Sequence, residues 1–287
     1  RLGVEKSRNL MTVRLAQKIG MEPVAAMAKR FGISENLPPH LAMALGASET
    51  TLLKITAGYA MLVNGGKRLV PSLIDRVQDR NGITVYRHDK RVCEGCRTDS
   101  WENQAVPIIP DTREQLVEPA SVYQVVSMLE GVVQRGTGRK IRVIKKPLAG
   151  KTGTSNNSRE TWFVGFSPDL VIGVYVGFDD RAKLGKRETG GSVAAPIFKQ
   201  FMEEALKGKA AVPFRIPAGI RLVRVNPRTG KLSKSYDKNF ILEAYKDGTV
   251  PDENTQYTVI EGSQSMLGGT KGALPVTSTV QSPSGLY

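Results

Sequence analysis

Four consecutive residues, Lys151-Thr152-Gly153-Thr154, carry the clearest chemical potential in this sequence. A lysine ammonium supplies positive charge, and threonine hydroxyls donate hydrogen bonds to anionic oxygens. Because glycine has no side chain, the backbone of a bound molecule can come close at Gly153. The segment predicts a surface that binds a carboxylate and stabilises negative charge. A turn between two strands, with a solvated lysine, is the alternative interpretation of these four residues taken alone.

A second polar group, Ser7-Arg8-Asn9, precedes an apolar helical pattern. Alternate side chains of an extended turn point the same way, so the hydroxyl of Ser7 and the amide of Asn9 can face one cleft. A hydroxyl can relay a proton, and an amide can hold a carbonyl group or a neighbouring lysine. Serine and asparagine are also common at helix N-caps, so a structural role is the simpler interpretation of this group in isolation.

The charge of the chain raises the question of a nucleic-acid partner. Its 287 residues include 41 Lys and Arg against 27 Asp and Glu, a formal net charge of +14. Such a chain attracts polyanions. The basic residues are dispersed singly or in short groups such as 183–187, however, and aromatic residues are only 6%. Since no RNA-binding or zinc-finger motif accompanies them, we expect a solvated basic face and no nucleic acid.

The two cysteines, Cys93 and Cys96, form a single C-x-x-C pair. One pair cannot supply the four ligands of a structural zinc site, and His40 and His88 are not spaced to complete it. The pair also lacks the strand-to-helix setting of a thioredoxin-type site. We therefore expect no metal and no cofactor. A local disulfide, which needs an oxidising compartment, and two free thiols both remain open.

Apolar periodicity places the polar motifs on elements of secondary structure. The spacing predicts helices over 10–20, 22–31, from Ser48 to Gly65, 120–135 and 192–206. Strands are predicted around 148–153, 161–166 and 170–178, and a β-hairpin turns at Asn81-Gly82. Helices before and after an antiparallel sheet indicate an α+β domain. Lys151 would then lie on an edge strand and Ser7 at the start of a helix.

Together and in this order, the two motifs resemble the transpeptidase domain of class A penicillin-binding proteins, whose motif set includes S-x-x-K, an S-x-N-like element and K-T-G. Longer segments carry the resemblance in the same order: EKSRNLMTVRLAQKIG, AMALGASETTLLKITAGYAMLVNGGKRLVPSLI, GVVQRGTGRK, PLAGKTGTSNNSRETWFVGFSPDLVIGVYVGFDD and KRETGGSVAAPIFKQFM. The resemblance covers residues 1–215. It implies the penicillin-recognising, β-lactamase-like fold, an antiparallel sheet flanked by helices. We expect this domain over 1–212, a small β-like extension over 213–245 and a largely disordered tail over 246–287.

The resemblance implies that the protein cross-links peptidoglycan. In that family a serine attacks the D-Ala-D-Ala end of a stem peptide, and the acyl group then passes to an amine of a neighbouring stem. By match, Ser7 is the proton-relay hydroxyl. Asn9 positions the substrate amide and the catalytic lysine, and Lys151 adds positive potential near Ser7. β-Lactams acylate the same serine, so they are expected partners together with the stem peptide.

The match also implies substrate-binding residues on the predicted edge strand. Thr152 and Thr154, which flank Gly153, would hold the terminal carboxylate of the substrate. The backbone N–H of Thr154 would be one donor of the oxyanion hole. Thr189-Gly190-Gly191 resembles a family loop near the cleft, to which no role is assigned.

The family's S-x-x-K, which holds the nucleophile and its general base, precedes the S-x-N. The S-x-x-K of this chain, Ser235 to Lys238, follows the K-T-G and is interpreted as chance. We therefore expect the nucleophile helix upstream of Arg1, together with a glycosyltransferase domain and a membrane anchor on the periplasmic side of a bacterial cytoplasmic membrane. The isolated chain would then be inactive. The basic face would be turned toward anionic envelope polymers and lipid head groups.

Two other functions fit parts of the sequence. A non-catalytic relative that binds peptidoglycan or partner proteins agrees with the missing serine, but not with an intact Lys151-Thr152-Gly153-Thr154 motif. A β-lactamase-type serine hydrolase shares the motif set. The five matching segments, and the lack of an early Glu-rich loop that could supply a deacylating base, favour the transpeptidase.

Overall fold

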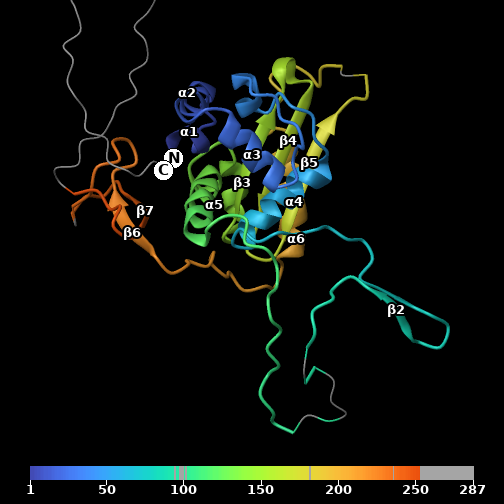
Figure 1. Cartoon of the computed structure of the whole chain (residues 1–287). Helices are drawn as coiled ribbons and strands as arrows, with labels where there is room; N and C mark the ends of the chain where they lie inside the picture. Colours follow the sequence, from blue (N-terminus) through green and yellow to red (C-terminus); the bar gives the residue numbers. More distant parts are fainter. Residues whose placement is uncertain (94, 97–99, 101, 181, 235, 253–287) are drawn as a thin grey trace, which may run out of the picture. The chain divides into compact units, whose positions relative to one another are not determined.

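The computed structural model describes residues 1–93, 95–96, 100, 102–180, 182–234 and 236–252 (Figure 1). Most of the expected tail, residues 253–287, and Ser235 of the sequence S-x-x-K therefore lie outside the described residues. In the part that is described, no helix is long and apolar enough to cross a membrane.

Six α-helices and seven strands are described, in mixed order along the chain. The helices are α1 (Leu2–Glu5), α2 (Asn9–Ile19), α3 (Glu22–Arg30), α4 (Leu52–Val63), α5 (Pro119–Gln134) and α6 (Ala194–Ala205), with 3-10 helices η1 (Leu41–Leu45), η2 (Arg139–Ile144) and η3 (Asn156–Ser158). The strands are β1 (Arg76–Gln78), β2 (Thr84–Arg87), β3 (Ala149–Thr154), β4 (Glu160–Phe166), β5 (Val171–Gly177), β6 (Ile220–Val225) and β7 (Ile241–Lys246).

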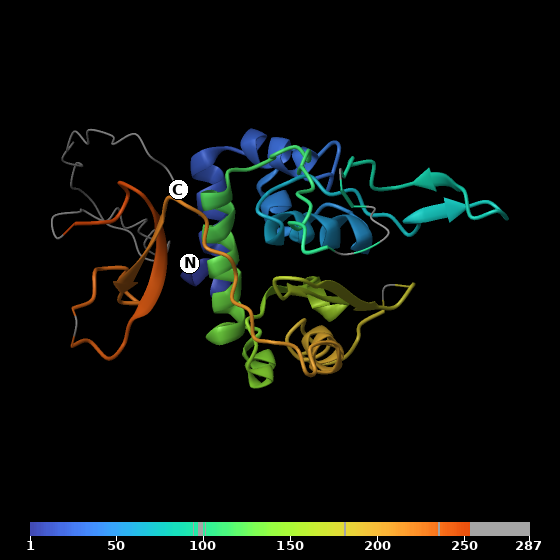
Figure 2. The ribbon, with the colours of Figure 1, turned by 90° about the horizontal axis from the view of Figure 1, so that it is seen from below.

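The antiparallel sheet β3-β4-β5 is the centre of the fold, and it is the flanked α+β sheet that the sequence predicts. Figure 2 shows α6 on one face of this sheet, with α4 and the other N-terminal helices toward the opposite face. Strand β4 lies in the middle, so β3 is an edge strand of the described sheet. Every second backbone group of β3 consequently points away from β4.

Aromatic side chains on opposite faces of β4 anchor the helices. The ring of Phe163 lies 4.8 Å from that of Phe198 of α6, and both side chains are fully buried. On the other face, Phe166 packs 6.2 Å from Tyr59 of α4 and 5.5 Å from Phe214, measured between ring centroids. Burial of each such side chain stabilises the fold by about 1.5–3 kcal/mol, so these contacts fix the sheet that carries the site.

Two facing glycines let α6 approach the sheet. Gly150 of β3 pairs with Gly165 of β4. A Cβ atom at Gly165 would lie 2.8 Å from the ring of Phe198, and one at Gly150 would lie 2.8 Å from the ring of Phe163. The small side chains therefore allow the aromatic rings to cover the strand directly before Lys151.

Two predicted helix starts are wrong. The N-cap of α4 is Thr51, whose side chain accepts a hydrogen bond from Lys54 N at 3.2 Å, and not Ser48. Helix α6 begins at Ala194 rather than at Ser192. Here Thr189 and Ser192 bond each other's backbone, with Thr189 N donating to Ser192 Oγ at 2.8 Å. Such side-chain bonds compete with helical hydrogen bonds and keep the segment in a turn.

Two hairpins lie outside the central sheet. The β1-β2 hairpin turns at Asn81-Gly82, as predicted, and its strand residues are exposed. Beyond it, Cys93 and Cys96 form a disulfide, which decides between the two states left open by the sequence. The β6-β7 hairpin is tied to α5, since Gln124 Nε2 donates to the carbonyl of Ala244 at 2.9 Å.

Candidate active site

Strand β3 carries the Lys151-Thr152-Gly153-Thr154 motif along the edge of the sheet. Its register with β4 pairs Lys151 with Val164 and Thr154 with Thr161. The alternative interpretation of the motif, a turn between strands, is therefore wrong. Lys151, Thr152 and Gly153 are half-buried and Thr154 is exposed. The motif thus lines an accessible edge on a rigid support, which is how binding side chains are held in place.

The ammonium of Lys151 reaches the other sequence motif. Lys151 Nζ donates to Ser7 Oγ at 2.8 Å and to the carbonyl oxygen of Thr152 at 3.0 Å. Among the described ion pairs, none involves Lys151. Burial lowers the pKa of the Lys151 ammonium. A half-buried cation with no carboxylate partner in this part of the chain leaves positive potential for an anionic ligand.

Ser7 lies in a tight connection between α1 and α2. Its φ of 51° is in the left-handed region, and Arg8 N donates to the carbonyl of Gly3 at 2.8 Å to close the turn. A positive φ is uncommon for a residue other than glycine, so the surrounding contacts hold Ser7 there. Asn9 begins α2 and is exposed. The structure therefore joins Ser7 to Lys151, while Asn9 follows two residues later on the helix start.

A buried carboxylate lies two residues before Ser7. Glu5 is only 4% exposed and forms ion pairs with Arg1 and Arg135, the latter at 2.5 Å. Burial raises the pKa of Glu5, but the hydrogen bonds and charges of Arg135 and Arg1 outweigh it and lower the pKa overall. A Cβ atom at Gly131 of α5 would overlap the Glu5 carboxylate, so glycine makes room for it there. This cluster fixes α1 against the end of α5.

Thr137, in the connection after α5, contacts both β3 and the end of α1. Its backbone N–H donates to the carbonyl of Glu5 at 3.1 Å, and its Oγ1 lies 2.8 Å from Oγ1 of Thr152. In this pair one hydroxyl donates its hydrogen to the other. The O–H of the accepting hydroxyl therefore stays available to a ligand. Thr137 therefore orients Thr152 and adds a hydroxyl to the same edge.

The segment Thr189-Gly190-Gly191 lies directly against β3. Gly190 N donates to Thr154 Oγ1 at 3.0 Å, which leaves the hydroxyl hydrogen of Thr154 for another acceptor. A Cβ atom at Gly190 would overlap the carbonyl of Trp162 and the backbone of Gly153. Only glycine fits this close approach. The segment that received no role from the sequence thus positions Thr154.

The arrangement gathers one ammonium and several hydroxyl groups along a strand edge. Lys151 supplies charge, Thr152 and Thr154 are each held by one protein hydrogen bond, and Ser7 touches the lysine. Charge-assisted hydrogen bonds from such groups suit a carboxylate, and the ammonium beside a serine hydroxyl suits proton transfer there.

Two residues that build this site, Glu5 and Thr137, were not predicted, and Gly190 was expected near the cleft but without a role. All three lie inside segments that carry the family resemblance: Glu5 at the start of EKSRNLMTVRLAQKIG, Thr137 in GVVQRGTGRK and Gly190 in KRETGGSVAAPIFKQFM. Thr137 could have been found from the sequence, because it is a polar residue next to glycine inside a matched segment. Arg1 is a local partner of Glu5, four residues away, but Arg135 lies 130 residues away along the chain, so no local pattern reveals the contact with α5.

The fold and the paired motifs define a transpeptidase domain of the penicillin-binding class. The model of the family "Penicillin binding protein transpeptidase domain" matches residues 1–203, and the chain belongs to this family. Penicillin-binding protein 1A of Rickettsia conorii is 43% identical, over 87% of this chain and 32% of that protein. Penicillin-binding protein 1A of Pseudomonas aeruginosa is 32% identical, over 86% of this chain and 34% of that protein.

A solved structure agrees with this assignment. The crystal structure of penicillin-binding protein 1A from Haemophilus influenzae matches with a TM-score of 0.73 and 26% identity, over 89% of this chain and 41% of that chain. The predicted resemblance to class A penicillin-binding proteins, and the fold it implied, are therefore confirmed. The chain spans about a third of the length of the curated relatives described above.

Proposed function

We propose that this chain is the C-terminal portion of a peptidoglycan D,D-transpeptidase, which cross-links stem peptides through an acyl-serine intermediate and is a target of β-lactams. Residues 1–212 belong to the transpeptidase domain, 213–245 form its small β-like extension and 246–287 its tail. The observation that carries the proposal is the hydrogen bond from Lys151 Nζ to Ser7 Oγ. This contact supports a single site built from the two family motifs, which are far apart in the sequence.

In this reaction the positive edge of β3 holds the end of the donor peptide. Thr152 and Thr154 donate hydrogen bonds to the terminal carboxylate of D-Ala-D-Ala, and Gly153 lets the substrate backbone approach. Lys151 supplies positive potential to the carboxylate and to Ser7. These roles are supported by the uncompensated ammonium and by the hydroxyl groups held by Thr137 and Gly190.

The proton moves through Ser7. As the nucleophilic serine forms the acyl bond, its proton goes to the general base and the amide bond to the terminal D-Ala breaks. The hydroxyl of Ser7 passes a proton to the leaving amine and regains one from the general base, while the contact with Lys151 stabilises the Ser7 oxygen. Asn9 holds the substrate amide and the catalytic lysine. The backbone N–H of Thr154 donates to the oxyanion of the tetrahedral intermediate.

The nucleophile and its general base belong to an S-x-x-K upstream of Arg1. A membrane anchor further upstream holds the domain on the periplasmic side of a cytoplasmic membrane. Ser235 to Lys238 is the only S-x-x-K of this chain and follows β3, in the wrong order for the family. The disulfide of Cys93 and Cys96 agrees with an oxidising compartment. The isolated chain alone is then inactive.

The test measures cross-linking by the protein that includes the upstream part and compares it with cross-linking by two lysine variants. It is given stem peptides that end in D-Ala-D-Ala, and the released D-Ala and the cross-linked dimer are quantified. We expect cross-links, and a large loss in the Lys151→Met variant but not in the Lys54→Met variant of α4. Binding of peptidoglycan with no release of D-Ala would contradict the proposal and favour the non-catalytic alternative.

A further inference from the structure

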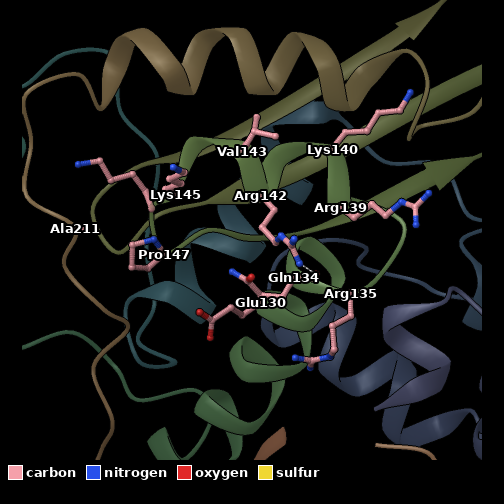
Figure 3. A pocket seen from close by; sticks show the side chains of 11 residues that line it. Glu130, Gln134, Arg135, Arg139, Lys140, Arg142, Val143, Lys145, Pro147 and Ala211 are labelled. Carbon is pink, nitrogen blue, oxygen red and sulfur yellow. Dashed lines mark hydrogen bonds between the residues drawn. The ribbon is translucent and has the colours of Figure 1, made fainter. Parts of the chain in front are cut away.

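A recess away from the strand edge lies between the C-terminal end of α5, η2 and the segment 145–147 (Figure 3). Its lining is strongly basic. The basic residues are Arg135, Arg139, Lys140, Arg142, Lys145 and Lys146. We call this recess the basic groove. Its one acidic lining residue is Glu130 of α5.

Most of this charge is uncompensated. Arg135 pairs with Glu5, while no ion pair of the described residues involves Arg139, Lys140 or Lys145, all of which are exposed. Like charges gathered in one recess repel each other, and concave walls concentrate the resulting positive field. A group of cations of this kind, most of them without an acidic partner among the described residues, attracts an anionic ligand.

The spacing of the charges favours an extended ligand. Figure 3 shows Arg139 and Lys140 projecting at one end of the recess and Lys145 at the other. Arg142 lies between them and donates to the carbonyl of Gln134 at 3.4 Å. A single small anion would contact one end only. A chain with several negative groups can reach both ends.

The floor of the groove indicates what kind of chain this is. Glu130 and Gln134 lie side by side there and are partly buried (Figure 3). Their side-chain oxygens accept hydrogen bonds from N–H groups, which a peptide backbone has at regular intervals and a sugar-phosphate backbone lacks. A planar membrane surface does not enter a concave recess.

We propose that the basic groove binds an acidic peptide segment of a partner protein. The acidic side chains pair with Arg139, Lys140 and Lys145 at the two ends, and the peptide backbone donates to Glu130 and Gln134. This binding is separate from the proposed transpeptidase reaction, because the groove does not include Ser7, Lys151 or the threonines of β3.

The test measures binding of a fluorescein-labelled peptide of alternating Glu and Gly to the whole 287-residue chain by fluorescence anisotropy. The groove variant carries Arg139→Glu, Lys140→Glu and Lys145→Glu. The matched control carries Lys183→Glu, Lys186→Glu and Arg187→Glu, the same charge change on another exposed basic segment. Thermal unfolding checks that both variants fold, and a variant with Gln at the three groove positions tests charge loss without reversal.

We expect the groove variant to bind the peptide at least ~10-fold more weakly, the Gln variant to bind at an intermediate level and the control to change less than ~2-fold. A peptide with Gln in place of Glu should not bind. Equal weakening in the groove variant and the control would overturn the proposal. So would equally effective competition by inorganic phosphate at matched ionic strength, or tighter groove-dependent binding to vesicles that contain phosphatidylglycerol.

Discussion

Lys151 Nζ donates a 2.8 Å hydrogen bond to Ser7 Oγ, which joins residues 144 positions apart. Lys151 lies on the edge of the central sheet, and Ser7 lies in the turn between α1 and α2. Two elements that are far apart in the sequence thus meet at one ammonium.

Replacement of Ser7 by alanine removes the hydroxyl that Lys151 contacts. We expect acylation of the protein that includes the upstream part by a penicillin to slow by ~10²–10⁴-fold, the usual contribution of a positioned proton-transfer group. Stopped-flow measurement of acylation tests this. Ser48→Ala, at a half-buried position that is not a helix cap, serves as the control and should react at the normal rate. A Ser7→Ala enzyme as fast as the wild type would remove Ser7 from the mechanism.

The charge of Lys151 should set the alkaline limb of the pH profile. Burial lowers its pKa from the ordinary value of 10.5, so the ammonium loses its proton at a lower pH than an exposed lysine. The acylation rate should therefore fall as pH rises through this lowered pKa. Lys151→Arg keeps its charge at high pH, so its alkaline limb should move to higher pH, whatever its absolute rate. If the alkaline limbs of the wild type and of Lys151→Arg coincide, the charge of Lys151 does not set this limb.

Thr137 should act through Thr152. The Thr137→Val variant removes the hydroxyl 2.8 Å from Thr152 Oγ1 and leaves a side chain of similar size. Loss of one such hydrogen bond costs about 0.5–1.5 kcal/mol, so we expect KM for a D-Ala-D-Ala peptide to rise by ~2–10-fold. Thr84→Val, on the exposed strand β2, is the control and should leave KM unchanged. A purely structural role would lower stability without this change in KM.

Glu5 should stabilise the domain in a pH-dependent way. Glu5→Gln weakens the buried ion pairs to Arg1 and Arg135, and we expect a loss of about 1.5–3 kcal/mol in the free energy of unfolding at neutral pH. Because the pKa of folded Glu5 is lowered, this stabilisation is present above the ordinary glutamate pKa and disappears as pH falls through the lowered value.

Urea unfolding at neutral and acidic pH measures the effect. The difference between wild type and Glu5→Gln should shrink at acidic pH. Glu203→Gln, which breaks the ion pair with Lys199 on the surface of α6, should cost less than ~1 kcal/mol at either pH. A constant difference between wild type and Glu5→Gln across pH would show that the charge of Glu5 is not the cause.

Gly190 should be intolerant of a side chain. In Gly190→Ala the new Cβ overlaps backbone atoms of Trp162 and Gly153, so the segment must move away from Thr154. We expect slower acylation and lower thermal stability. Gly138→Ala places its Cβ no closer than 3.4 Å to any neighbour at a φ of −93° and is the matched control. Equal effects of the two substitutions would argue against a specific close approach at Gly190.

Local pattern predicted the elements well where apolar spacing was regular. The three strands of the sheet and the helix α5 lie where periodicity put them, and the Asn81-Gly82 turn closes its hairpin. The helix starts failed because side-chain bonds decided them: Thr51 caps α4, and Thr189 and Ser192 hold a turn before α6. Such choices between neighbouring polar residues are not visible in apolar spacing.

The site was predictable only in part. Residue chemistry and family resemblance both pointed to Ser7 and Lys151, and these two residues are in contact. Glu5 was not predicted, and Gly190 was expected near the cleft but without a role. Their roles depend on atoms far away in sequence: the guanidinium of Arg135 for Glu5, and the backbone of β3 and β4 for Gly190. Long-range contacts of this kind follow from tertiary packing, not from local composition.

The central claim is that this chain supplies the binding and proton-transfer half of an acyl-serine site whose nucleophile lies upstream. Intact-mass spectrometry with a penicillin tests it most directly, on the isolated chain and on the protein that includes the upstream part. We expect one covalent adduct on the longer protein, at an upstream serine followed three residues later by lysine, and none on the isolated chain. An adduct at Ser7 or Ser235 of the isolated chain, or no adduct on the longer protein, would contradict it.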